Sequence, residues 1–171
     1  MKKIISLLFA STLLLSANEC KLDKKILYSI LLNESLPQKI GYPHIISFNE
    51  DSDAARAKKV YKKYFLNNRT IDCKNENTCK NILTNLTQHN IVNLDVGAFQ
   101  INYKYHTMPI ENYFRFSDSY KYACGFITEL INEHGYNWKA IASYHSKTEK
   151  YNNRYRRKLM ANYKAISSVM N

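Results

Sequence analysis

The sequence predicts a mainly α-helical single domain with one short β or irregular segment. Along most of the chain, apolar residues recur at the three- and four-residue spacing of an amphipathic helix. The stretch 90–106 differs, because apolar and polar residues alternate there around a glycine, which favours a short strand or a turn. Residues 18–171 have the length of one ordinary domain with a hydrophobic core, and no repeat or linker divides them.

Residues 1–17 are expected to be a signal peptide and to lie outside the fold. Lys2 and Lys3 precede an uncharged apolar run over residues 4–15, and the small residues Ser16 and Ala17 follow it. The run is too short to cross a bilayer well, so we expect cleavage after Ala17 and export of the mature domain. A retained membrane anchor is the alternative interpretation.

The mature chain is predicted to contain one short strand and six helices. Asp23 is a suitable N-cap for the first helix, and Pro37 stops it. Residues 45–48 favour a strand, whereas residues 68–80 favour a polar loop. Gly135 is a natural C-cap and Asn137 a natural N-cap. The predicted helices cover residues 24–34, 53–66, 78–89, 117–135, 138–145 and 152–168.

Four cysteines follow the predicted signal peptide, and an even number in an exported chain suggests two disulfides. Cys73 and Cys79 are separated by five polar residues, which suits the closure of a local loop. Their pairing leaves Cys20 with Cys124. A zinc site is the disfavoured alternative, because the spacing lacks paired C-x-x-C units.

The chain is basic, with a net charge of +11. Such a charge indicates an acidic polymer as a partner, but it does not choose among nucleic acid, anionic lipid and cell-wall glycan. The sequence has no base-reading motif and no continuous basic stripe, which disfavours nucleic acid. The Tyr- and Arg-rich cluster at residues 151–157 is expected to be a solvated helix face.

Glu34 ends an apolar helix face. Ile26, Ile30 and Glu34 are four residues apart and therefore share one face of the predicted helix. Apolar surroundings disfavour the charged form of a carboxyl group, so the pKa of Glu34 is expected to rise. A carboxyl that stays protonated near neutral pH can serve as a general acid.

Three short motifs follow one another along the chain, namely Glu34-Ser35, Gly97-Ala98-Phe99-Gln100-Ile101 and Tyr144-His145-Ser146. With them the chain resembles the soluble lytic transglycosylases of the lysozyme-like superfamily, most closely the small exported members associated with type IV secretion. Each motif alone is weak, but their order and rough spacing agree over nearly the whole mature chain. The resemblance implies a periplasmic, lysozyme-like domain whose β or irregular segment lies beside an active-site groove.

The sequence departs from the common family pattern in three ways. Phe99 stands where the family usually has Met, and His145 stands where it usually has Asn. About 60 residues separate Ser35 from Gly97, which is more than in the minimal domain. The secretion-associated members carry a long segment there too, although the resemblance assigns no role to residues 37–95. Cysteines near the mature N-terminus and before the third motif also recur in that subgroup, which supports the Cys20–Cys124 pairing.

The resemblance implies cleavage of the β-1,4 bond between N-acetylmuramic acid and N-acetylglucosamine in peptidoglycan. Glu34 would protonate the departing oxygen, and the sugar's own 6-hydroxyl would then attack the anomeric carbon and lose its proton to the same Glu34. The product would end in a 1,6-anhydro sugar, and the reaction needs no metal or organic cofactor. An ordinary glycosidase uses two carboxylates. Asp95 is the nearest second candidate here, although a turn or capping role is favoured for it.

The resemblance also assigns roles around the acid. Ser35 would hydrogen-bond near the acid or the substrate, and Gln100 would bind acetamido or peptide groups. Tyr144 would hold Glu34 through its hydroxyl. The other candidate substrate-binding residues are Gly97 and Ala98, where the backbone would approach the glycan, His145, and the ring-stacking candidates Phe99, Tyr103 and Tyr105.

Other functions stay open at this point. A hydrolytic muramidase would use water and a second carboxylate. A non-catalytic domain would bind peptidoglycan or assemble a secretion complex, and envelope-spanning secretion or conjugation machinery is a candidate partner for the transglycosylase as well. A basic exported protein that acts on nucleic acid or membrane has the least support.

Overall fold

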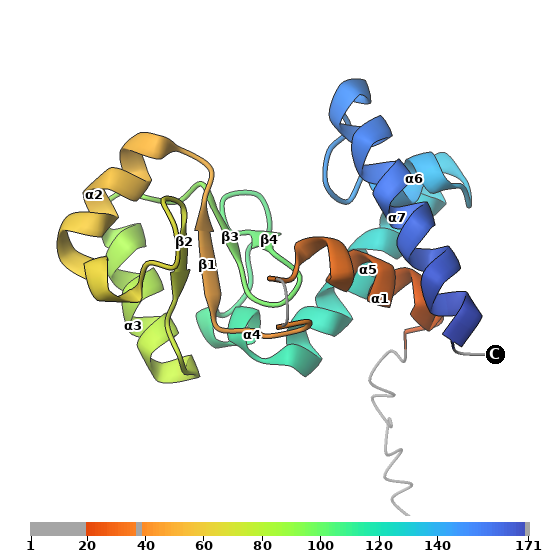
Figure 1. Ribbon diagram of the computed structural model, residues 1–171. Coiled ribbons are helices and arrows are strands. Elements are labelled where there is room, and N and C mark those ends of the chain that lie inside the picture. Colours follow the sequence, from red (N-terminus) through yellow and green to blue (C-terminus); the bar gives the residue numbers. More distant parts are fainter. Residues whose placement is uncertain (1–19, 37–38, 170–171) are drawn as a thin grey trace, which may run out of the picture.

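The computed structural model describes residues 20–36 and 39–169, and the chain it describes is mainly helical with one small antiparallel sheet (Figure 1). This agrees with the mainly helical class predicted from the sequence, although four strands form where one short strand was predicted. The predicted signal peptide and its cleavage site lie outside the described residues. No helix within the described ranges is long and apolar enough to cross a membrane.

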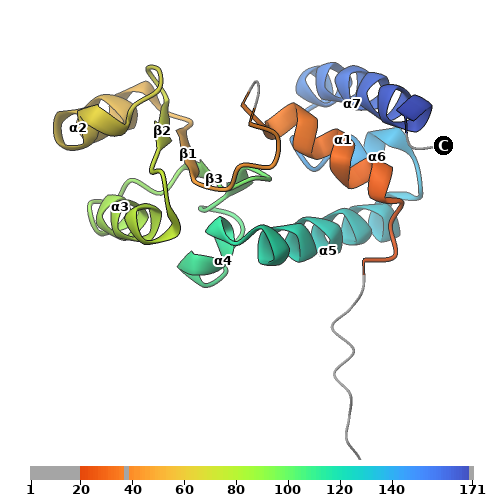
Figure 2. The same ribbon diagram turned by 60° about the horizontal axis from the view of Figure 1, so that its bottom comes forward.

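Four helices pack together on one side of the molecule and are called the helical lobe here. In Figure 2, α1 lies between α5 and α7, and it contacts both of them. The side chain of Asp23 caps α1 by accepting a hydrogen bond from the backbone N–H of Lys25. The four helices are α1 (Lys24–Glu34), α5 (Phe116–His134), α6 (Trp138–Ala142) and α7 (Glu149–Val169).

The sheet and the remaining helices form the sheet lobe. Its strands are arranged in the order β2-β1-β3-β4. On the central strand β1, Ile46 pairs with Ile71 of β2 and with Val96 of β3, and all three are completely buried. The strands are β1 (Ile45–Phe48), β2 (Thr70–Asp72), β3 (Leu94–Val96) and β4 (Ile101–Asn102).

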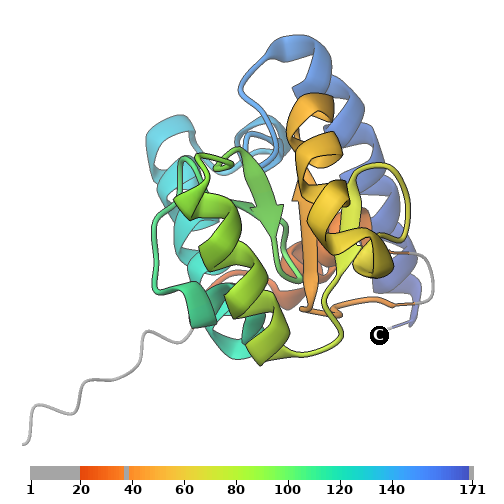
Figure 3. The same cartoon turned by 90° about the vertical axis from the view of Figure 1, so that its left-hand side faces the viewer.

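Two helices cover the side of the sheet that faces away from the helical lobe, as Figures 1 and 3 show. They are α2 (Asp51–Tyr61), which continues into the 3-10 turn η1 (Lys62–Tyr64), and α3 (Glu76–Gln88). The short helix α4 (Ile110–Phe114) contacts α3 and the start of α5, and it thereby joins the two lobes.

Both predicted disulfides are present. Cys20, just before α1, is bonded to Cys124 in α5, and Cys73 is bonded to Cys79 across the loop between β2 and α3. The described residues contain no free cysteine. Disulfides persist mainly in oxidising compartments, so this arrangement agrees with an exported protein.

The structure corrects several predicted boundaries. The loop expected at residues 68–80 contains β2, and α4 forms where no helix was predicted. The helix predicted at residues 53–66 begins at Asp51 and ends earlier, at Tyr61. Within residues 138–145 only Trp138–Ala142 is helical, and the last helix begins at Glu149 rather than at residue 152.

Asp72 explains why a polar segment becomes a buried strand. Its carboxylate is completely buried and accepts hydrogen bonds from Lys39 Nζ at 2.9 Å, Lys74 Nζ at 2.7 Å and the Tyr42 hydroxyl at 2.8 Å. Burial alone would raise the pKa of Asp72, but these hydrogen bonds outweigh it and lower the pKa well below its ordinary value. The carboxylate therefore holds the chain after α1 against β2.

Candidate active site

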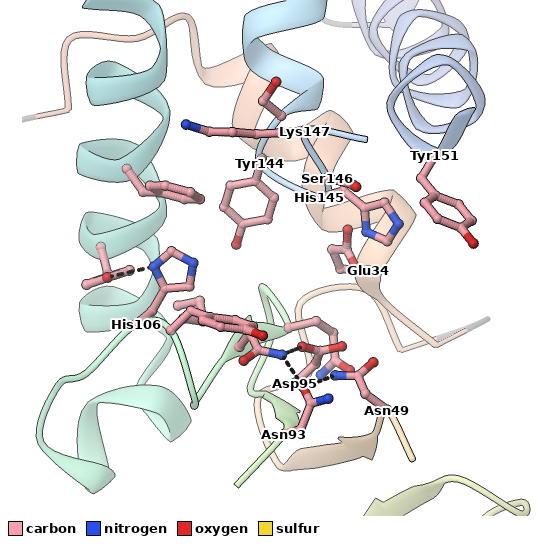
Figure 4. Close-up of a pocket in the computed structure, with 17 residues that line it drawn as sticks. Glu34, Asn49, Asn93, Asp95, His106, Tyr144, His145, Ser146, Lys147 and Tyr151 are labelled. Carbon is pink, nitrogen blue, oxygen red and sulfur yellow. Dashed lines mark hydrogen bonds between the residues drawn. The ribbon is translucent and has the colours of Figure 1, made fainter. Parts of the chain in front are cut away.

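A groove of about 720 Å³ lies between the two lobes (Figure 4). The helical lobe lines it with Glu34, Tyr122, Phe126, Ser143, Tyr144, His145, Ser146, Lys147 and Tyr151. The sheet lobe lines it with Asn49, Asn93, Asp95, Gln100, Ile101, Asn102, Tyr105 and His106. Amide, aromatic and ionisable side chains thus share one cavity, which is the kind of surface that binds a polar ligand with flat rings.

Glu34 reaches the groove from the C-terminal end of α1. The preceding turns of α1 are anchored in the core by the buried Ile26, Leu27, Ile30 and Leu31. Glu34 itself is only partly exposed, and burial raises its pKa to about 7, with a further increase from the negative charge of Asp95. A hydrogen bond from Tyr155 and the charge of Lys158 oppose this increase. The carboxyl is therefore protonated in a substantial fraction of molecules near neutral pH.

Tyr155 holds the carboxyl of Glu34. Its hydroxyl donates to Glu34 Oε1 at 2.7 Å, and the tyrosine is buried in α7 with a relative exposure of 6%. The ring of His145 stacks on Tyr155 at a centroid distance of 4.7 Å and an interplanar angle of 9°. Burial lowers the pKa of His145, although the charge of Asp95 opposes the shift. The acid, the tyrosine and the histidine are thus held as one unit by helices α1 and α7 and the segment between α6 and α7.

Asp95 enters the same groove from β3, on the opposite lobe (Figure 4). Its Oδ1 accepts a hydrogen bond from Asn102 Nδ2 at 2.8 Å, and Asn102 also donates to Asn93. Burial raises the pKa of Asp95, while the hydrogen bond from Asn102 opposes the shift. The turn or capping role favoured from the sequence is wrong, because Asp95 is a strand residue that faces the groove together with three asparagines, Asn49, Asn93 and Asn102.

Tyr144 lies in the groove but does not make the contact that the sequence suggested. Its hydroxyl donates to the backbone carbonyl of Phe99 at 2.8 Å, which ties the end of α6 to the turn between β3 and β4. The expected hydrogen bond to Glu34 is made by Tyr155 instead. The interpretation of residues 151–157 as a solvated face rather than a ligand site is also wrong in part, because Tyr151 lines the groove.

The second motif forms the β3–β4 turn, and most of its residues do not line the groove. Gly97 has φ of 78°, and a Cβ atom there would lie 2.0 Å from the carbonyl oxygen of Tyr113, so the glycine permits a close approach of α4 rather than of a ligand. Ala98 and Phe99 are buried, and the ring of Phe99 packs against Phe116 and Tyr120. The substrate-stacking role expected of Phe99 is therefore wrong.

Gln100 and the next residue, Ile101, are the two residues of this motif that line the groove. The Nε2 of Gln100 donates to the carbonyl of Gly97 at 2.8 Å, and the backbone of Gln100 has a left-handed φ of 46°. The turn therefore fixes the direction of the amide, as expected of a residue that presents a polar group to a ligand.

The remaining predicted residues divide between the groove and the surrounding structure. Tyr105 lines the groove and is 69% exposed, whereas Tyr103 packs beside the core. Ser35 follows the acid in sequence, but its hydroxyl accepts a hydrogen bond from the backbone N–H of Gly41 at 2.8 Å. Ser35 therefore shapes the chain after α1 and is not among the groove residues.

Sequence reasoning missed a second aromatic side of the groove. His106 packs on Phe126 at a centroid distance of 4.4 Å, and its Nδ1 lies 3.1 Å from the hydroxyl of Tyr122. Tyr122 and Phe126 lie one turn apart on α5. This spacing shows in the sequence that they share a helix face, but the same spacing is typical of residues that pack in a core.

The described residues contain no group of three or more His, Cys, Asp or Glu side chains arranged to hold a metal ion. Comparisons of the chain with family models, curated proteins and solved structures gave no match. The geometry of the groove therefore carries the functional argument.

Proposed function

We propose that the protein is an exported lytic transglycosylase with a lysozyme-like fold that cleaves the β-1,4 bond between N-acetylmuramic acid and N-acetylglucosamine in the periplasm. The observation that carries this proposal is Glu34, whose pKa is about 7 and whose carboxyl faces an inter-lobe groove. A general acid works best when its pKa lies near the working pH. Two lobes with an acid between them also suit a polymer that passes through a groove.

In the proposed reaction Glu34 gives its proton to the glycosidic oxygen as the bond between that oxygen and the anomeric carbon breaks. The 6-hydroxyl oxygen of the same muramic acid forms the new bond to the anomeric carbon, and its proton passes to the Glu34 carboxylate. No water is consumed, and the acid returns to its starting state. Tyr155 occupies Oε1 of Glu34, so we assign the transferred proton to Oε2.

The other groove residues suit this substrate. Gln100 and the asparagine cluster around Asp95 offer amide donors and acceptors for acetamido and hydroxyl groups. Tyr105, Tyr122 and Phe126 offer faces on which sugar rings can stack. The reaction requires no metal or organic cofactor.

A hydrolytic muramidase is the second candidate, and Asp95 is the observation that favours it. A retaining or inverting glycosidase places a second carboxylate across the bond from the acid, and Asp95 lies on the opposite side of the groove from Glu34. Asp95 would then activate water or stabilise the positive charge of the sugar.

Digestion of purified peptidoglycan separates these candidates. We expect the mature protein to release muropeptides that are lighter by one water than muramidase products, as read by mass spectrometry. Glu34→Gln should abolish their release, while Asp51→Asn, which removes an exposed carboxylate on α2 outside the groove, should leave it unchanged. Reducing products that need both Glu34 and Asp95 would establish the muramidase. Binding of peptidoglycan without any release would indicate a scaffold.

A further inference from the structure

A second pocket of about 180 Å³ opens beside the groove and shares Glu34, His145 and Tyr151 with it. We call it the side pocket. Its remaining walls are Asn33 from α1 and Arg154, Tyr155 and Lys158 from α7. It has about a quarter of the volume of the groove, 180 against 720 Å³, so it suits a branch of a ligand rather than a second stretch of polymer.

The side pocket carries positive charge that the surrounding protein does not neutralise. Arg154 and Lys158 are four residues apart on α7, so they project from one face of the helix. Neither takes part in an ion pair among the described residues. The acidic group on the pocket wall is Glu34, which is largely neutral below its pKa of about 7. An anionic ligand group would therefore meet two cations and a protonated acid.

We propose that the side pocket binds a carboxylate of the peptide stem that branches from the muramic acid of peptidoglycan. This inference rests on the proposed function, since it names the part of the substrate next to the reacting bond. In a strand that carries its stem peptides, the lactyl carboxyl of muramic acid is bound in the amide bond to the stem, so the free carboxylates are those of the stem peptide. The planar guanidinium of Arg154 can hold a carboxylate with two parallel hydrogen bonds, and Lys158 adds a point charge.

The position of the side pocket gives the contact a consequence for catalysis. Tyr155 lines the side pocket and holds Glu34, and His145 stacks on Tyr155. A stem carboxylate in the pocket would orient the muramic acid directly beside the acid. We therefore expect strands whose stem peptides carry free carboxylates to be bound and cleaved better than strands whose stem carboxylates have been amidated.

Calorimetric titration tests the inference without requiring catalysis. The probe is a muramyl tetrapeptide with free carboxylates, and the comparison ligand is the same molecule with its carboxylates amidated. We expect the free acid to bind the mature protein about tenfold more tightly than the amide, because hydrogen bonds to charged groups are the strong ones. Raising the salt concentration should reduce the difference, since the cations are exposed.

Two matched double variants locate the contact. Arg154→Gln with Lys158→Gln should remove the preference for the acid, whereas Arg157→Gln with Lys164→Gln removes two exposed charges from the same helix outside the pocket and should keep it. Equal binding of acid and amide by the unmodified protein would overturn the inference, as would equal losses in both double variants. Should the first double variant not fold, the acid–amide comparison on the unmodified protein still decides.

The outcome is distinguishable from a failure of the proposed function. If the protein releases no muropeptides but prefers the free acid and loses this preference with Arg154 and Lys158, the enzyme proposal fails and the carboxylate site stands. If it releases anhydro-muropeptides at equal rates from strands with free and with amidated stem carboxylates and binds acid and amide equally, the enzyme stands and the side pocket has no such role.

Discussion

The pKa of Glu34 is set by groups that raise it and groups that lower it. Burial and the charge of Asp95 raise its pKa, and the Tyr155 hydroxyl lowers it, with a net result of about 7 against an ordinary value of 4.5. The folded protein therefore binds this proton more tightly than the unfolded chain does. Its contribution to stability is fully present below pH 4.5 and is lost as the pH rises through about 7. The acid therefore makes the folded protein less stable in alkaline solution than in acid.

Tyr155→Phe should raise the pKa of Glu34 further. The hydroxyl of Tyr155 donates to the carboxylate and stabilises its charged form, so removing the hydroxyl disfavours ionisation. A titration of the ¹³C-labelled glutamate carboxyl by NMR should show the shift, and the alkaline limb of the activity profile should move to higher pH. The loss of one buried hydrogen bond should lower stability by about 1 kcal/mol.

Tyr144→Phe is the matched control for that experiment. It removes a hydroxyl from the same groove, but one that donates to the carbonyl of Phe99, so the titration of Glu34 should not move. A shift with Tyr144→Phe and none with Tyr155→Phe would return the supporting role to Tyr144.

The two tyrosines also show how far the sequence predicts single residues. The position of Glu34 at the end of an apolar helix face, and hence its raised pKa, follows from local spacing. The choice between Tyr144 and Tyr155 depends on how α7 packs on α1 and how α6 packs on α5 and α7, which no local pattern contains. Phe99 was misplaced for the same reason, since its side chain points into the core from a turn.

At the scale of elements, β2 depends on one buried carboxylate. Asp72→Asn should destabilise the protein by about 1–3 kcal/mol at pH 7, because it breaks a buried charge network whose two lysines are partly exposed. Folding lowers the pKa of Asp72, so its contribution is present above the unfolded value of 3.8 and is lost as the pH falls through the folded value. Urea unfolding at pH 7 and pH 3 should therefore show a smaller difference between the two proteins in acid.

Asp51→Asn provides the comparison. Asp51 pairs with Arg69 at 2.6 Å, but both side chains are exposed, so the substitution should change stability little at either pH. Equal effects of the two substitutions would mean that the Asp72 network does not hold β2.

The elements that the sequence predicted well are three helices with long apolar periodicity and one short apolar strand. The α1 helix and the β1 strand have the predicted bounds, and α5 and α7 agree with the predicted ranges to within a few residues. The strand β2 was missed because its burial comes from Lys39 and Tyr42, which lie 30 or more residues away in the sequence. The five-residue helix α4 is too short to show a helical period.

At the scale of the molecule, the site exists only where the lobes meet. Glu34 comes from the helical lobe, whereas Gln100 and Asp95 come from the sheet lobe. The motifs in the sequence identified Glu34 and Gln100 as candidates for one site. The side pocket and the aromatic wall arise from packing between helices, and the sequence alone did not separate those residues from core or solvated positions.

The Cys20–Cys124 disulfide should contribute most to the stability of this arrangement. It joins the start of α1 to α5 and closes a sequence separation of 104 residues, against 6 for Cys73–Cys79. In the chain-entropy account of disulfides, loops of these sizes correspond to about 4–5 and about 2 kcal/mol. Replacing both cysteines of each pair by alanine and measuring urea unfolding should therefore show the larger loss for Cys20 and Cys124.

Side-chain packing favours the opposite order of the two losses of stability, so the predicted order cannot be explained by packing. Cys73 and Cys79 are completely buried, so their replacement by alanine also removes core contacts, whereas Cys20 is only partly buried. A larger loss of stability for Cys20–Cys124 would therefore have to come from the greater conformational entropy of the unfolded chain once this disulfide is removed. An equal or reversed order would show that the core contacts of Cys73 and Cys79 contribute as much to stability as the closure of the longer loop, or more.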